Sequence, residues 1–67
     1  MSVARITEIS ASSPTSFEDA LQAGIARAVK TLKNVEGAWV QEQKVVVRSG
    51  AISEYRVNLK VTFILED

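Results

Sequence analysis

The only tryptophan of the chain, Trp39, lies in the segment NVEGAWVQEQ at residues 34–43. A large aromatic side chain on a predicted strand either fills an apolar contact or offers a flat surface on which a ligand can stack. Residues two apart on a strand share a face and lie about 6.6 Å apart. With a regular register, Gly37, Trp39, Gln41 and Gln43 therefore point to the same side of the strand, and Gly37 leaves a gap beside the indole.

Catalytic and metal-binding chemistry has little support in the composition. The chain has no histidine and no cysteine, which excludes histidine-based catalysis, disulfides and most zinc or other transition-metal sites. The eight carboxylates never occur at the spacing of a calcium-binding loop. We therefore expect no enzymatic activity, no catalytic residues and no metal ligands that the sequence alone identifies.

The chain length predicts a single domain over residues 1–67 that needs partners. A protein of this size buries only about 60% of its unfolded surface, so its core is marginal. Without disulfides or a structural metal, oligomerisation is the remaining way to stabilise the fold. The net charge is zero, with eight basic and eight acidic residues, and this argues against nucleic acid as a partner.

The sequence carries no apolar run near the length of a membrane span, about 20 residues. Its opening, MSVARITEIS, lacks a charged segment followed by an apolar one, as a secretion signal has. These observations predict a soluble cytoplasmic protein with no membrane contact.

The periodicity of the apolar residues predicts four elements that position Trp39. Residues 3–9 read as a first strand, and SASSPTS at residues 10–16 as a turn. An apolar stripe from Phe17 to Leu32 at spacings of three and four predicts a helix. Ser16 and Asp19 form a variant of the capping box at its start.

Beyond the helix the period changes from 3.6 to two. Asn34 can end the helix in a left-handed conformation, and Gly24 in mid-helix predicts close contact with a sheet. A second strand is expected at residues 38–48, a turn at SGAIS (49–53) and a third strand at 54–66. The predicted fold class is α+β, a β-α-β-β chain whose three-stranded antiparallel sheet has the order 1-3-2 and is wrapped on one helix.

The predicted elements differ in length, and this difference predicts self-assembly. A strand of about 12 residues rises roughly 40 Å, whereas a helix of about 17 residues covers only about 25 Å. One helix cannot cover three such strands, so Trp39 and the run Val45-Val46-Val47 need other subunits to cover them. The sequence therefore predicts an obligate homo-oligomer built by sheet contacts.

Three segments resemble the dodecins, and the resemblance extends over essentially the whole chain. The matching segments are SSPTSFEDA (12–20), KTLKNV (30–35) and EYRVNLKVTFILED (54–67). Dodecins are small β-α-β-β proteins that form hollow dodecamers and bind flavins between subunits. The resemblance implies a homo-dodecameric shell that binds, stores or sequesters FMN or riboflavin and that is not an enzyme.

The flavin-binding residues of the family match this sequence only in part. The family's stacking tryptophan falls on Gly37, and its glutamine on the third strand falls on Arg56. Lys44 matches a basic residue often found late in the second strand, whereas Ile64 replaces an arginine near the end. The pairs Glu42-Gln43 and Tyr55-Arg56 resemble a branch of the family that lacks the tryptophan and is associated with calcium.

Two interpretations of these replacements remain open. In the first, Trp39 supplies the stacking surface one pleat further along, Arg56 donates to flavin carbonyls and Lys44 meets a ligand phosphate. Gly37, Gln41, Trp39, Lys44 and Arg56 are then the candidate flavin-binding residues.

In the second interpretation, Trp39 fills a contact between subunits, and the assembly is structural or binds a cation such as calcium. Gly37 then avoids a clash or permits a turn, and Arg56 pairs with Glu36 or Glu54 across the interface. Lys44 is in that case a solvated charge near the end of a strand.

Overall fold

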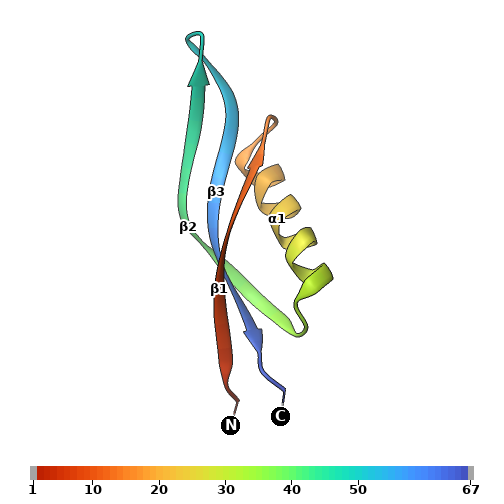
Figure 1. The fold of residues 1–67 in the computed structure, drawn as a ribbon. Helices are drawn as coiled ribbons and strands as arrows, with labels where there is room; N and C mark the ends of the chain where they lie inside the picture. The colour runs from red at the N-terminus through yellow and green to blue at the C-terminus, as the bar shows by residue number, and fades with distance from the viewer. Residues whose placement is uncertain (1, 67) are drawn as a thin grey trace.

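The chain forms three antiparallel strands and one helix, which confirms the predicted fold class. The computed structural model describes residues 2–66, and its elements follow one another as β-α-β-β (Figure 1). The central strand of the sheet is the last in sequence, because the strand order is β1-β3-β2 with both pairs antiparallel. The elements are β1 (Ala4–Ser13), α1 (Phe17–Thr31), β2 (Val35–Arg48) and β3 (Ala51–Ile64).

The first strand is longer than predicted, because the segment expected as a turn belongs mostly to the sheet. β1 continues to Ser13, which pairs with Tyr55, and only residues 14–16 connect it to the helix. Serines disfavour strands only weakly, and pairing along the long β3 outweighs this preference. Ser13 is 3% exposed and donates a hydrogen bond from its hydroxyl to Asp19 at 2.6 Å, so the end of β1 is tied to the start of the helix.

The connection between β2 and β3 is also shorter than predicted. Ser49 and Gly50 have φ angles of 52° and 77°, and the strands pair on either side of them, Arg48 with Ala51. Two consecutive residues with positive φ are typical of the tight hairpin turn whose twist matches that of the strands. The segment 51–53 therefore belongs to β3, and the hairpin is longer than the sequence suggested.

The helix starts at the predicted signal but ends before the residue expected to stop it. The hydroxyl of Ser16 accepts a hydrogen bond from the backbone N–H of Asp19 at 3.0 Å, which confirms the N-cap. The helix ends at Thr31 with Leu32 as an extended C-cap, so Asn34 does not end it; Asn34 has the expected left-handed conformation, with φ of 61°, in the connection to β2. Its side-chain amide donates to Glu66 Oε1 at 2.8 Å and its carbonyl accepts from the N–H of Ile64 at 3.0 Å, so the helix exit is joined to the end of β3.

The core lies between one face of α1 and one face of the sheet. Val57, Leu59 and Val61 alternate along β3 and are at most 1% exposed. They pack against small helical residues, among them Ala20 and Ala28. Partly buried side chains of the helix and its C-cap, of β2 and of β1 extend this core: Phe17, Leu21, Ile25, Leu32, Val35, Ile9 and Ala11. The predicted alternation of β3 is therefore confirmed.

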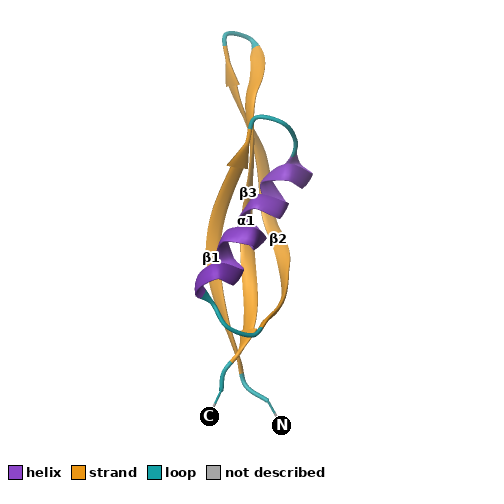
Figure 2. Ribbon diagram, turned by 90° about the vertical axis from the view of Figure 1, so that its right-hand side faces the viewer, coloured by secondary structure: helices purple, strands orange, loops and turns teal. Residues whose placement is uncertain are grey.

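The opposite face of the sheet carries no helix and is called here the open face (Figure 2). The helix lies over β1 and β3, and the β2–β3 hairpin projects beyond it (Figure 1). At about 1.5 Å per residue the 15 residues of α1 span about 22 Å, whereas the molecule is 51 Å long. The predicted mismatch between helix and sheet is thus present. Among residues 2–66, nine large apolar side chains are exposed: Val3, Ile6, Val29, Trp39, Val40, Val45, Val47, Ile52 and Leu65.

Among residues 2–66, no helix is long and apolar enough to cross a membrane. The cytoplasmic location expected from the sequence stays a prediction.

Gly24 marks the closest approach of helix and sheet, as its position in mid-helix predicted. A Cβ atom added there meets Leu59 Cδ1 at 3.0 Å and Ala11 Cβ at 3.1 Å. We expect Gly24→Ala to lower the free energy of unfolding by about 1 kcal/mol, because overpacking costs about 1–3 kcal/mol and the gain in helix propensity is only about 1 kcal/mol. Chemical denaturation at one fixed protein concentration measures this change.

Gln22→Ala, at an exposed position of the same helix, is the control and is expected to change stability by less than about 0.5 kcal/mol. A Gly24→Ala variant more stable than the native chain would contradict the proposed close packing.

Candidate ligand-binding face of the sheet

The open face presents Trp39 in a row with two charged residues. Trp39 pairs with Lys60 of β3, which in turn pairs with Glu8 of β1, so all three side chains point to the same side. The indole is 47% exposed. The Lys60 ammonium lies 5.9 Å from the centre of the ring, within the range of a cation–π contact. Trp39 is thus a surface aromatic in the single chain, with a cation on its β3 side.

Gly37 stands on the same face as Trp39, as predicted, and its surroundings are open. It pairs with Thr62, two positions along β3 from the partner of Trp39. An added Cβ at Gly37 meets nothing within 4 Å, and its φ is not positive. Within the chain neither a clash nor a turn explains this glycine, so the turn of the second interpretation was wrong, whereas a clash with another subunit stays a prediction. The space beside the indole is available to a ligand or to another subunit.

A β-bulge changes the register beyond Trp39 and corrects the predicted set of neighbours. Val40 pairs with Leu59 and Glu42 with Asn58, so Gln41 is an extra residue in β2 that has no partner of its own. Past the bulge, Glu42 and Lys44 join the open face, whereas Gln43 pairs with the buried Val57 and lies on the helix side. The prediction that Gln43 shares the face of Trp39 was wrong, because it assumed a regular register.

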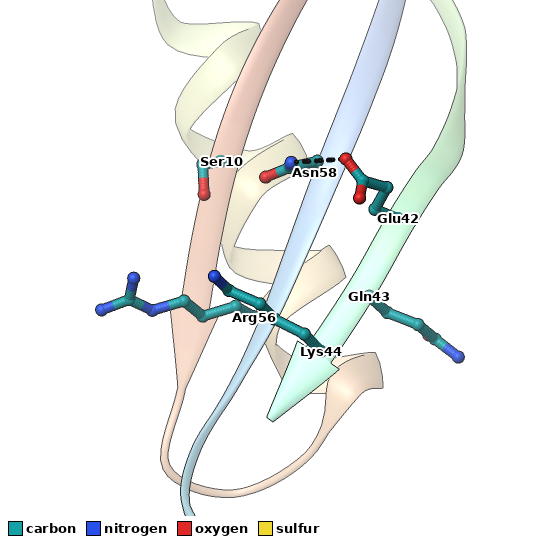
Figure 3. Close-up of a pocket in the computed structure, with 6 residues that line it drawn as sticks. All are labelled: Ser10, Glu42, Gln43, Lys44, Arg56 and Asn58. Carbon is teal, nitrogen blue, oxygen red and sulfur yellow. Dashed lines mark hydrogen bonds between the residues drawn. The ribbon is translucent and has the colours of Figure 1, made fainter. Parts of the chain in front are cut away.

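The bulge places a shallow polar hollow of about 210 Å³ next to the aromatic row. Asn58 donates to Glu42 Oε1 at 3.4 Å across its floor, and Figure 3 shows Gln43 pointing away from the other residues drawn. The hollow is lined by Ser10, Glu42, Gln43, Lys44, Arg56 and Asn58. It therefore combines hydroxyl, amide and carboxylate oxygens with two cations.

The two cations of the hollow come from a single cross-strand pair, Lys44 of β2 and Arg56 of β3. The Arg56 guanidinium forms an ion pair through Nε with Glu54, two residues earlier on the same strand. Glu54 was one of the two partners expected for Arg56, although the contact was expected between subunits. Both side chains of the pair are accessible, at 44% for Arg56 and 22% for Glu54, so the remaining guanidinium N–H groups can reach a ligand.

Four residues of the hollow, Ser10, Glu42, Gln43 and Asn58, were not among the predicted site residues. Three of them form one row across all three strands, since Ser10 pairs with Asn58 and Asn58 with Glu42. The alternation of β3 could have identified Asn58, which shares a face with Arg56 and Lys60 in the sequence pattern. Glu42 could not be found in this way, because only the bulge at Gln41 turns it to the open face.

A metal site of three or more acidic, histidine or cysteine side chains does not occur among the described residues of one chain. Glu8, Glu42 and Glu54 all pair on the open face, but each lies in a different row. A single chain therefore offers isolated carboxylates rather than a coordination sphere.

The fold and this face define a class: a small β-α-β-β chain with an accessible, ligand-sized polar face that carries one aromatic. A family profile described as Dodecin matches residues 3–66. The chain belongs to the dodecin family.

Two relatives illustrate the similarity. The calcium dodecin of Mycobacterium tuberculosis is 36% identical over 63 residues, which cover 94% of this chain and 89% of that protein. The dodecin of Thermus thermophilus is 37% identical over 60 residues, covering 90% and 87%.

Crystal structures of both relatives share this fold. An arginine-to-alanine mutant of the T. thermophilus dodecin superposes with a TM-score of 0.93 at 34% identity, and each chain is covered completely. The M. tuberculosis structure, described as a calcium-chelating antigen with a novel calcium-binding site, has a TM-score of 0.83 at 35% identity, with 96% and 91% covered.

The bulge at Gln41 can be tested directly. Deleting Gln41 leaves a regular ladder in which Val40 still pairs with Leu59 and Glu42 with Asn58, so both rows keep their faces and only the local distortion of the bulge is lost. We therefore expect the deletion to change stability by less than about 1 kcal/mol, or about 5 °C in Tm, measured by circular dichroism. Inserting one alanine between Glu42 and Gln43 instead shifts the rest of β2 by one residue and turns Lys44 away from the open face, which should lower Tm by about 10 °C or more. A deletion that lowers Tm as much as the insertion would contradict the assignment of Gln41 as the extra residue.

Proposed function

We propose that this chain binds FMN or riboflavin on the open face of its sheet, with Trp39 as the stacking surface, within a homo-dodecamer. The observation that carries the proposal is an indole that is 47% exposed and stands beside the open space at Gly37. Membership of the dodecin family supports a flavin as the flat ligand. The role is binding and storage, in keeping with a composition that lacks histidine and cysteine.

The aromatic row supplies the stacking energy. A nucleobase stacked on an aromatic side chain contributes on the order of 1–3 kcal/mol to binding. The isoalloxazine ring of a flavin is also flat and aromatic, so we expect a similar contribution from stacking on Trp39. Lys60 lies 5.9 Å from the centre of the indole and orients the ring from one side. Gly37, one pleat along β2, leaves room for the part of the ligand that extends past the indole.

Arg56 and Lys44 supply the polar contacts of the ligand. Four residues separate Lys60 from Arg56 along β3, about 13 Å at 3.3 Å per residue. A flavin with its ribityl phosphate side chain can bridge this span. The phosphate of FMN then meets Lys44 and the free N–H groups of Arg56, which favours FMN over riboflavin. Gln41, in the bulge between the two rows, lies beside the path of the side chain.

Assembly completes the proposal, since a single chain leaves the ligand on an open surface. The nine exposed apolar side chains and the uncovered sheet face support contacts with further copies of this chain. Twelve copies is the number that the family resemblance implies. In such a shell the flavin lies between subunits, and the neighbouring copy excludes water from it.

Titration of the native protein with FMN and riboflavin tests the proposal. We expect the emission of Trp39 to be quenched with saturation, and the flavin emission to fall with the same midpoint. Trp39→Ala should weaken binding by about 1–3 kcal/mol, whereas Trp39→Phe, which keeps a ring, should lose less. Unchanged Trp39 emission at high micromolar flavin would remove the proposal.

A second candidate function is calcium binding, which one specific observation favours. Glu42 is exposed on the open face, and its carboxylate lies beside the Asn58 amide. Carboxylate and amide oxygens are the ligands that Ca²⁺ prefers. A relative that is 36% identical is named calcium dodecin. Copies of the chain brought together by symmetry can gather several such carboxylates.

Calorimetric titration with CaCl₂ tests this second function. Saturable heat is expected with the native assembly, and Glu42→Gln, which keeps the shape and removes the charge, should weaken binding at least about tenfold. A colourless protein that binds Ca²⁺ but no flavin would favour calcium as the function. Absence of heat at millimolar Ca²⁺ would exclude it.

A further inference from the structure

The end of the β2–β3 hairpin forms an arm, residues 46–54, that extends past the last pair of β1 with β3 (Figure 1). Val47 and Ile52 pair with each other on this arm and are 60% and 52% exposed. Val45, at the base of the arm, pairs with Tyr55 of the helix-side face, and Val47 follows two residues later on the same side. The arm therefore carries an apolar patch on the side of the helix, beyond the end of the helix.

An apolar groove lies on the same side of the sheet, between α1 and the first residues of β2. It has a volume of about 410 Å³ and exists because the helix packs on β1 and β3 and leaves the start of β2 uncovered. Val29, which the helical stripe predicted to be buried, is 51% exposed in its wall. The groove is lined by Leu21, Ile25, Val29, Val35, Glu36, Gly37 and Ala38.

The arm and the groove of one chain cannot meet. Val47 on the arm lies nine positions after Ala38 in the groove, about 30 Å along β2 at 3.3 Å per residue. The strand between them is paired with β3 along its length, so the arm cannot fold back. If the arm fills such a groove, the groove belongs to a second copy.

The charges at the two surfaces are complementary. Glu36 is the one charged residue of the groove, and no cation forms an ion pair with it in the part of the chain that the structure describes. Arg48, next to Val47, donates only to the hydroxyl of Ser53 at 3.2 Å and has no carboxylate partner among residues 2–66. An apolar arm edged by a free cation thus matches an apolar groove edged by a free carboxylate.

We propose that the arm of one copy docks in the groove of another, with Val47 and Ile52 inserted between α1 and β2 and Arg48 beside Glu36. This inference rests on the self-assembly proposed above and names the contact that carries it. The groove is on the helix side of β2, so the docked arm packs behind the segment that presents Gly37 and Trp39, not over the ligand face.

A charge-reversal cycle tests the contact. Arg48→Glu and Glu36→Arg each place like charges together, so each should raise the protein concentration at half-dissociation roughly tenfold. The double variant restores an opposite pair and should return within about threefold of the native value. Sedimentation velocity measures the dissociation. A double variant that is weakened by the product of the two single effects would overturn the pairing.

Cysteine cross-linking gives an independent test, because the chain has no native cysteine. Subunits carrying Val47→Cys are mixed with subunits carrying Val29→Cys, exchanged through denaturant and oxidised; we expect a disulfide-linked pair. The matched control is Arg27→Cys, which lies on the other side of the same helix beside β1. Cross-linking to Arg27→Cys in preference to Val29→Cys would overturn the proposed groove.

The sedimentation experiment distinguishes a failure of the proposed assembly from a failure of the proposed arm docking. A native chain that stays monomeric in the sedimentation experiment contradicts the proposed assembly itself. If the native chain assembles but the double variant is weakened by the product of the two single effects, only the docking of the arm is contradicted. The proposed assembly and flavin site are then unaffected.

Discussion

The structure depends on one mismatch, that between a helix of 15 residues and two strands of 14. The helix covers β1 and β3 near the middle of the molecule, and Val57, Leu59 and Val61 are the only large side chains buried completely among residues 2–66. The five buried hydrophobic residues of this described range make a small core for a chain of this length. Both the open face and the exposed apolar arm follow from this mismatch, because no further element of the chain can cover them.

The same mismatch links assembly to ligand binding. Trp39 stands on the open face, so the contacts that stabilise the shell and the contacts that enclose a ligand use neighbouring surfaces of the sheet. The bulge at Gln41 separates an aromatic row from a polar one and turns Glu42 and Lys44 toward the ligand side. Because the bulge absorbs Gln41, Trp39 and the charged Glu42 and Lys44 stay on one face, which can hold both a flat ring and a charged group.

The fold was predictable from the sequence because its signals are local and consistent. The cap at Ser16, the apolar stripe of the helix and the alternation along β3 gave the correct elements, strand order and buried face, although the helix ends before Asn34. The limits of β1 were wrong because pairing with β3 outweighs the turn preference of the serines. The neighbours of Trp39 were predicted only as far as the bulge, since an inserted residue leaves no mark in a period-two pattern. The open space at Gly37 could not be predicted from the sequence, because it depends on the absence of side chains from other parts of the chain around this position.

The mass of the native particle tests the central claim that this chain is completed by copies of itself. Native mass spectrometry at micromolar concentration, with and without FMN, measures it without any substitution. We expect one dominant species of about twelve times the 7.3 kDa chain, present with or without the flavin. A dominant 7.3 kDa species that binds FMN as a single chain would contradict self-assembly as the basis of the site, because ligand binding would then need no second subunit.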